Sequence, residues 1–234
     1  MPRRPPLGQH FLRATQYADR AVEAAGLTKD DIVLEVGPGE GVLTKRLLPR
    51  VAKLVCVEID PELAEGIARD FPAVELVRGD AVQVPWPRFD ACVSNLPYQI
   101  SSPFLFRLLS CEFRVAVLLV QKEFADRLVA KPRTSDYGRL SVNAQRRAAI
   151  ELLAKVPPGA FDPPPRVDSA LVKIVPRPPS FDAPPNYDAV VERAFAQRRK
   201  KLSNTLGRKE IPFADARPEE LTPEEFALVA RALL

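Results

Sequence analysis

The 234-residue chain has a single histidine, His10, and only three cysteines, Cys56, Cys92 and Cys111. One histidine argues against histidine-based metal clusters and catalytic triads. Three widely spaced cysteines make neither a disulfide framework nor a zinc site, and they are typical of buried small residues in a reducing compartment. We therefore expect a cytoplasmic protein that binds no metal.

Long apolar runs are also lacking. The longest, Val115–Val120, is far short of the roughly 18 residues that a membrane span requires. The first six residues are basic, but no apolar segment follows them, so they do not form a secretory signal. Apolar residues still make up 46% of the chain, enough for a sizeable core. This length fits one domain, or one large domain with a small appendage, and we expect a monomer with no membrane partner.

The net charge of +4 is unevenly distributed. Residues 1–138 carry 18 basic and 18 acidic side chains, whereas residues 139–209 carry 14 basic and 6 acidic ones. A neutral body with a basic later region favours an anionic partner such as nucleic acid. The alternative is an ordinary solvated charged face.

A glycine-rich turn follows the first apolar run of the chain. Ile32–Val36 predicts a buried strand, which leads into Gly37-Pro38-Gly39-Glu40-Gly41 and then a helix over residues 42–48. Glycines at such a turn let a nucleotide approach the backbone closely. The G-x-G-x-G spacing differs from the G-x-G-x-x-G of dinucleotide-binding proteins. The alternative is a tight turn with no ligand.

Acidic residues close the next two predicted strands. Glu58 ends the second strand about 20 residues after the glycines, where a carboxylate that binds ribose hydroxyls is expected. Asp60, just before Pro61, is assigned to capping the following helix. Asp80 follows a strand over residues 74–77 and can hydrogen-bond an adenine amino group, although Gly-Asp is also ordinary turn chemistry.

The stretch Asn95–Tyr98, which follows a fourth predicted strand, has the groups needed to bind a planar amine. Asn95 and the Leu96 carbonyl can accept hydrogen bonds from an exocyclic N–H group, Pro97 donates none, and Tyr98 offers a ring for stacking. A plain turn is the alternative, because Asn and Pro are common turn residues. The alternation of strands and helices predicts an α/β fold with a doubly wound parallel sheet, which places these four residues near the glycine turn.

The later part of the chain is rich in proline. Residues 150–156 and 170–175 predict a final hairpin, joined by a stiff loop in which Phe161 either holds the far face of a flipped base or packs on the core. A proline-rich linker over residues 176–185 predicts a boundary between domains at 1–178 and 179–234. A helix over residues 187–206 carries a basic cluster that could contact phosphates: Arg198, Arg199, Lys200 and Lys201.

Taken in order, these stretches resemble the KsgA-type ribosomal RNA adenine N6,N6-dimethyltransferases. The matching stretches are Gly8–Leu12, Glu35–Gly41, Glu58–Asp60, Gly79–Ala81, Asn95–Pro103, Gln121–Glu123, Tyr137–Ser141, Phe161–Ser169 and Ala194–Leu206. The chain departs from the family pattern at two positions, His10 and Ser94, where members often have Asn and Gly.

The resemblance implies a class I S-adenosylmethionine-dependent methyltransferase, with a Rossmann-like, seven-stranded, mostly parallel sheet and a small C-terminal helical domain. Its substrate would be two adjacent adenosines near the 3′ end of small-subunit rRNA in a pre-30S particle, with a role in ribosome biogenesis. By the same resemblance, the cofactor would contact His10, Leu12, Gly37, Gly39, Glu58, Asp80 and Asn95. Catalysis would use Asn95, Leu96, Pro97, Tyr98 and Phe161.

Three alternatives stay open from the sequence. A dinucleotide-dependent oxidoreductase would share the fold, but the glycine spacing and Asn95–Tyr98 disfavour it. An adenine methyltransferase acting on large-subunit rRNA or DNA would share the chemistry. A ribosome-assembly factor without catalysis is the third, and the intact Asn95, Glu58 and glycines argue against it.

Overall fold

The computed structural model describes residues 9–178 and 181–234 of the chain. Gly8 of the first matching stretch and Pro179 at the predicted boundary lie outside the described residues. The chain divides into two compact units. The first runs up to Ala125 and resumes over Glu151–Pro176, and the second comprises Asp126–Ile150 and Arg177–Leu234.

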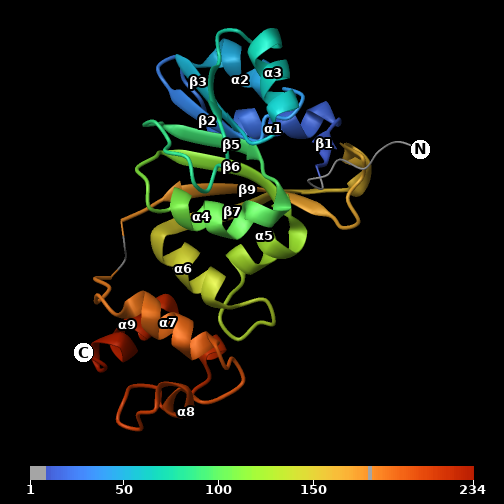
Figure 1. The fold of residues 1–234 in the computed structure, drawn as a ribbon. Helices are drawn as coiled ribbons and strands as arrows, with labels where there is room; N and C mark the ends of the chain where they lie inside the picture. The colour runs from blue at the N-terminus through green and yellow to red at the C-terminus, as the bar shows by residue number, and fades with distance from the viewer. Residues whose placement is uncertain (1–8, 179–180) are drawn as a thin grey trace. The chain divides into compact units, whose positions relative to one another are not determined.

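The first unit contains a seven-stranded sheet (Figure 1). The strand order is β4-β3-β2-β5-β6-β9-β7; β2 to β6 pair in parallel, and β9 pairs antiparallel with β6. This confirms the predicted α/β fold with a mostly parallel sheet. The strands are β2 (Ile32–Val36), β3 (Lys53–Glu58), β4 (Glu75–Arg78), β5 (Ala91–Asn95), β6 (Val115–Gln121), β7 (Ala148–Val156) and β9 (Ser169–Pro176).

Helices connect most of the successive parallel strands, although β4 leads to β5 without one. Helix α1 packs against β5, β6 and β9, and its buried alanines and valine join the core of the unit. None of the helices within the described ranges is long and apolar enough to cross a bilayer. The helices are α1 (Thr15–Ala25), α2 (Thr44–Leu47), α3 (Pro61–Asp70), α4 (Ser101–Leu108) and α5 (Lys122–Val129), with short 3₁₀ turns at Leu48–Arg50, Tyr98–Ile100 and Pro158–Ala160.

Strand register brings the polar strand ends to one edge of the sheet. Val36 pairs with Val57, Glu58 with Arg78, and Asn95 with Leu119. Parallel strands that end at the same level place the residues after them side by side. The glycine turn, Glu58, Asp80 and Asn95 therefore meet at the carboxyl edge.

A second, two-stranded sheet was not predicted. Strand β1 (Phe11–Leu12) pairs antiparallel with β8 (Phe161–Asp162), with Leu12 opposite Phe161. Backbone N–H groups of Arg13 and Ala14 also donate to the Ala160 carbonyl, at 2.8 and 3.1 Å. The start of the described chain is thereby fastened to the proline-rich loop that follows β7.

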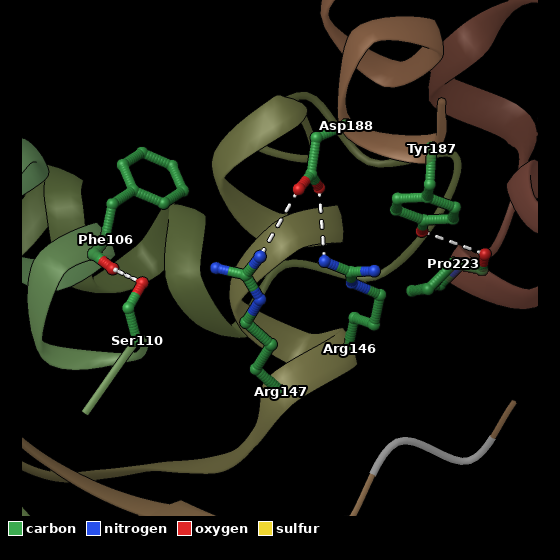
Figure 2. Close-up of polar contacts among 7 residues, drawn as sticks. All are labelled: Phe106, Ser110, Arg146, Arg147, Tyr187, Asp188 and Pro223. Atoms are coloured by element: carbon green, nitrogen blue, oxygen red, sulfur yellow. Dashed lines mark hydrogen bonds and ion pairs between the residues drawn. The ribbon is translucent and has the colours of Figure 1, made fainter. Parts of the chain in front are cut away.

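The second unit is helical and has its own core. It contains α6 (Arg139–Arg147), α7 (Tyr187–Phe195), α8 (Leu202–Leu206), a 3₁₀ turn at Pro218–Glu220, and α9 (Pro223–Arg231), with α6 packing on α7 and α9. Figure 2 shows how polar contacts join these helices: Arg146 and Arg147 reach Asp188 at 3.2 and 3.3 Å, and the Tyr187 hydroxyl donates to the Pro223 carbonyl at 2.9 Å.

This packing differs from the predicted domain limits of 1–178 and 179–234. Residues 126–150 group with the C-terminal helices, because the Tyr137 side chain is buried among them and its hydroxyl donates to the Leu221 carbonyl at 2.8 Å. A single cut in the proline-rich linker misses this, since the second unit is built from two separate segments.

The single helix expected over residues 187–206 is wrong. Helix α7 ends at Phe195, and α8 begins at Leu202 after a turn closed by Lys200 N–H donating to the Gln197 carbonyl at 2.9 Å. The first N–H groups of α8 donate to the Ala216 and Ala214 carbonyls instead of continuing the earlier helix. Apolar periodicity extended across the break because both helices bury apolar residues in one core.

Candidate functional site

A cavity of about 410 Å³ lies in the first unit at the carboxyl ends of β2 to β5. Ligand pockets commonly have roughly this size and occur at this edge of α/β sheets. Ten of the predicted site residues line it: His10, Leu12, Gly37, Gly39, Glu58, Asp80, Asn95, Leu96, Pro97 and Tyr98. These ten residues therefore surround one cavity, and the roles assigned to them stay predictions.

The glycine turn needs glycine at the wall of the cavity. Gly37 and Gly39 have φ angles of +64° and +56°, which residues with a Cβ atom rarely adopt. A Cβ on Gly37 would lie 3.3 Å from Pro97 Cδ, and one on Gly39 would lie 3.0 Å from the Phe11 ring. The absent side chains therefore let the loop after β2 approach both β1 and the Asn95–Tyr98 turn.

Glu58 is buried at the end of β3 and holds three backbone groups. Its Oε1 accepts hydrogen bonds from Ile59 and Asp60 N–H at 2.9 and 3.0 Å, and Oε2 accepts from Gly39 N–H at 3.4 Å. Burial raises the pKa of this carboxyl, and the backbone donors partly offset the rise. Oε1 thus uses both of its lone pairs, whereas Oε2 keeps one, so Glu58 can fix the glycine loop and still accept from a ligand hydroxyl through Oε2.

Asp60 lies two residues beyond Glu58 and caps α3. Its Oδ1 accepts from Glu62 and Leu63 N–H at 2.9 and 3.2 Å. The predicted capping role of Asp60 is thus confirmed, because its carboxylate accepts from otherwise unpaired N–H groups of the first helical turn.

Asp80 both forms a turn and lines the cavity. Its carboxylate accepts from Val82 N–H at 2.8 Å and from the Gln83 side chain at 3.0 Å. Arg107 of α4 clamps the same loop, donating to the Ala81 and Val84 carbonyls at 2.9 and 2.5 Å. No sequence pattern indicated Arg107, because a lone arginine on a helix resembles any solvated charge.

The Asn95–Tyr98 segment begins at the last residue of β5 and runs into the 3₁₀ turn that starts at Tyr98. The Asn95 amide nitrogen donates to the His10 carbonyl at 3.2 Å, which leaves Oδ1 as the amide atom available to accept from a ligand. Leu96 N–H donates to the Leu119 carbonyl at 3.1 Å. The Tyr98 hydroxyl and Ser169 Oγ lie 2.6 Å apart, and burial raises the pKa of the phenol. The segment is a turn geometrically, and its polar groups are oriented by neighbouring elements.

Phe161 does not line this cavity. Its side chain is 4% exposed and packs in the core of the first unit, while its backbone pairs with Leu12. Of the two possibilities considered for this residue, the structure supports packing, and stacking on a base is not supported. The basic cluster Arg198–Lys201 belongs to the second unit and is not part of the cavity lining.

No group of three or more metal-ligating side chains is found in residues 9–178 and 181–234. The cavity is also lined by two acids to which no sequence pattern gave a role, Glu35 of β2 and Glu40 of the glycine turn. Glu35 is 1% exposed, and its Oε2 accepts from the Thr44 hydroxyl at 2.8 Å. Burial raises the pKa of Glu35 from 4.5 to about 7.

We expect Glu35→Gln to change the pH dependence of stability. The folded state binds the Glu35 proton more tightly than the unfolded state, so this contribution is complete below the unfolded pKa and is lost as pH rises through the folded pKa of about 7. At about 1.4 kcal/mol per pKa unit, the loss is about 3 kcal/mol. Relative to the parent, the free energy of unfolding of the variant, measured in urea, should therefore rise by about 3 kcal/mol between about pH 4 and pH 8. If the difference in free energy of unfolding between the two proteins did not change with pH, the raised pKa of the Glu35 carboxyl would be contradicted.

Comparison with known proteins gives consistent matches. A family model described as ribosomal RNA adenine dimethylase matches residues 2–215. A probable ribosomal RNA small subunit methyltransferase A of Methanosarcina acetivorans is 44% identical, covering 96% of this chain and 91% of the relative. One of the same description from Pyrococcus abyssi is 42% identical, covering 94% and 87%.

Solved structures agree with these matches. A dimethyladenosine transferase from Plasmodium falciparum superimposes with a TM-score of 0.83 at 30% identity, covering 93% of this chain and 94% of the other. The 23S rRNA methyltransferase ErmE superimposes with a TM-score of 0.75 at 30% identity, covering 95% and 99%.

Proposed function

This chain belongs to the ribosomal RNA adenine dimethylase family, and we propose that it transfers methyl groups from S-adenosylmethionine to N6 of adenosines in small-subunit rRNA. The observation that carries the proposal is the cavity in which the glycine turn, two carboxylates and the Asn95–Tyr98 segment meet. Unit 1 would carry methyl transfer, and unit 2 would supply RNA contacts.

The cofactor half of the cavity fits S-adenosylmethionine chemically. Gly37 and Gly39 leave open the space that a Cβ would fill, Glu58 Oε2 would accept from a ribose hydroxyl, and Asp80 would accept from the adenine amino group. When bound, the cofactor supplies an electrophilic methyl group on a sulfonium. His10 and Leu12 of the N-terminal segment would complete the wall.

Asn95 and Leu96 would prepare the acceptor nitrogen. The N6 lone pair of adenine is delocalised into the ring, so the nitrogen is a poor nucleophile. Oδ1 of Asn95 and the Leu96 carbonyl would accept from its two N–H groups and favour a pyramidal, more nucleophilic nitrogen. Holding the acceptor in line for attack supplies much of the rate, and no side chain is required as a strong base.

Tyr98 would compensate the cost of removing the base from its stack. Stacking on an aromatic ring is worth roughly 1–3 kcal/mol per base. Pro97 contributes by ending β5 and packing on Gly37, which fixes the direction in which the turn leaves the sheet. Phe161 is left out of this role, since it packs in the core.

Within the basic cluster of unit 2, we assign phosphate contacts to Arg199 and Lys200. Arg198 is paired with Glu219 at 2.6 Å and also donates to the Thr134 carbonyl, and Lys201 is paired with Asp215 at 2.8 Å. Among the described residues, Arg199 and Lys200 are exposed and have no such partner. An exposed cation without a partner is available to replace counterions on RNA.

Replacing Arg199 and Lys200 together by alanine should weaken RNA binding and flatten its salt dependence. Because the variant can no longer neutralise two phosphates, the slope of log K against log salt should fall by about 1.5. Filter binding of rRNA over a salt series measures it. Arg208→Ala with Lys209→Ala removes the same charge from the same unit, and an equal effect of this pair would show that net charge, not the cluster, governs binding.

Large-subunit rRNA is the second candidate substrate, favoured by the likeness to ErmE. The two candidate substrates are distinguished by supplying unmethylated small and large ribosomal subunits in competition, with tritiated S-adenosylmethionine. Label in small-subunit rRNA, mapped by primer extension, supports the proposal. Label confined to the large subunit would replace it, and cofactor binding without transfer to either would favour an assembly factor.

A further inference from the structure

The Tyr98 ring is held at its hydroxyl by a residue far away in the sequence. Ser169 Oγ lies 2.6 Å from the phenolic oxygen, and Ser169 is fully buried at the start of β9. Tyr98 itself is only half-buried and lines the cavity. The ring therefore has one end fixed inside the protein, while part of its surface faces the space where a base would enter.

A second ring lies against Tyr98. The His10 and Tyr98 ring centroids are 5.7 Å apart with a 34° angle between planes, within the range of favourable aromatic contacts. His10 Nδ1 is 2.8 Å from the Pro163 carbonyl, and since a carbonyl only accepts, Nδ1 carries the donated proton. The imidazole is thus fixed by the backbone of the proline-rich loop and forms a wall beside Tyr98.

The Pro163 carbonyl and Ser169 lie within, and directly after, one loop that is itself anchored. Pro163 lies within the loop over residues 157–168, and Ser169 immediately follows it. Asp168 fastens the end of the loop: its carbonyl accepts from Lys122 N–H at 2.9 Å, and its side chain pairs with Lys155 at 2.8 Å. The loop thus has a fixed frame from which to hold a side chain of the site.

We propose that Ser169 is a positioning residue that, with the His10 ring as a wall, fixes the plane of the Tyr98 ring before RNA binds. The proline-rich loop would then serve the site through Pro163 and Ser169, not by presenting Phe161. This inference rests on the proposed stacking role of Tyr98. A pre-oriented ring does not have to be ordered when the base arrives, so the loss of the tether should appear in kcat.

The test compares Ser169→Ala, Tyr98→Phe and the double variant. Each single change removes the same hydrogen bond from one end, so each should lower kcat by roughly three- to tenfold, the factor that corresponds to one neutral hydrogen bond. The double variant should be no slower than either single one. The KM for S-adenosylmethionine and the affinity for unmethylated small subunits should not change. If Ser169→Ala fails to fold, Tyr98→Phe still tests the tether without altering β9.

Two controls separate the possible failures. Ser141→Ala removes a buried hydroxyl that bonds Arg127 and Gly138 in unit 2, so it reports a stability loss unrelated to Tyr98. Tyr98→Ala tests stacking itself and should lower kcat by a larger factor than Tyr98→Phe does. A Ser169→Ala enzyme with parental kcat, or losses that multiply in the double variant, would overturn the tether. Parental activity in Tyr98→Ala would instead overturn the proposed stacking.

Discussion

Asn95→Ala should lower methyl transfer by about 10²–10³-fold, the usual cost of losing one pre-oriented polar group at a reacting centre. Asn95 supplies an acceptor for the amino group, and its own amide nitrogen is already engaged by the His10 carbonyl at 3.2 Å. The amide is therefore oriented before any ligand binds. Alanine removes the acceptor and also loosens the N-terminal segment from the end of β5.

Single-turnover transfer to unmethylated small subunits measures this effect, with binding measured separately. RNA affinity should be largely retained, because the phosphate contacts are assigned to unit 2. Cofactor affinity should fall by much less than the rate. If RNA affinity and rate fell together by the same factor, Asn95 would be a binding residue and the assigned role would be wrong.

Glu58→Ala should raise the Kd for S-adenosylmethionine by roughly 10- to 100-fold. Hydrogen bonds to a charged group contribute about 1.5–3 kcal/mol. The variant also leaves the N–H groups of Gly39, Ile59 and Asp60 without their acceptor, so the glycine loop loses its attachment to β3. Calorimetric titration of the protein with S-adenosylmethionine gives the Kd directly.

Asp60→Ala is the matched control for this experiment. It removes an acid from the same strand end, but Asp60 caps α3, so we expect a loss of about 1 kcal/mol in stability and little change in cofactor affinity. Equal losses of affinity in the two variants would mean that the negative charge of this edge, not the position of Glu58, binds the ligand.

The carboxyl edge of the sheet could be predicted because its signals are local. A strand, a turn and the next helix are each encoded within about ten residues, and parallel topology then brings Gly37, Glu58, Asp80 and Asn95 together. The family prediction is confirmed, since the family model matches residues 2–215.

Other features could not be predicted from the sequence, because they depend on contacts between distant segments. Ser169 reaches Tyr98 only because β9 returns beside β6, and a serine at a strand start has no signal of its own. Phe161 could be read as core or as a stacking ring, and its burial opposite Leu12 decides for core. The helix break before Leu202 is set by the 214–216 segment, which no local pattern shows.

The central claim is that this chain dimethylates adenosine in small-subunit rRNA. Its most direct test is mass spectrometry of nucleosides from unmethylated small ribosomal subunits incubated with the protein and methyl-labelled S-adenosylmethionine. We expect N6,N6-dimethyladenosine carrying two labelled methyl groups, formed about 10²–10³-fold more slowly when Asn95→Ala replaces the parent protein. Label in a different nucleoside, or no label while the cofactor binds, would contradict the account.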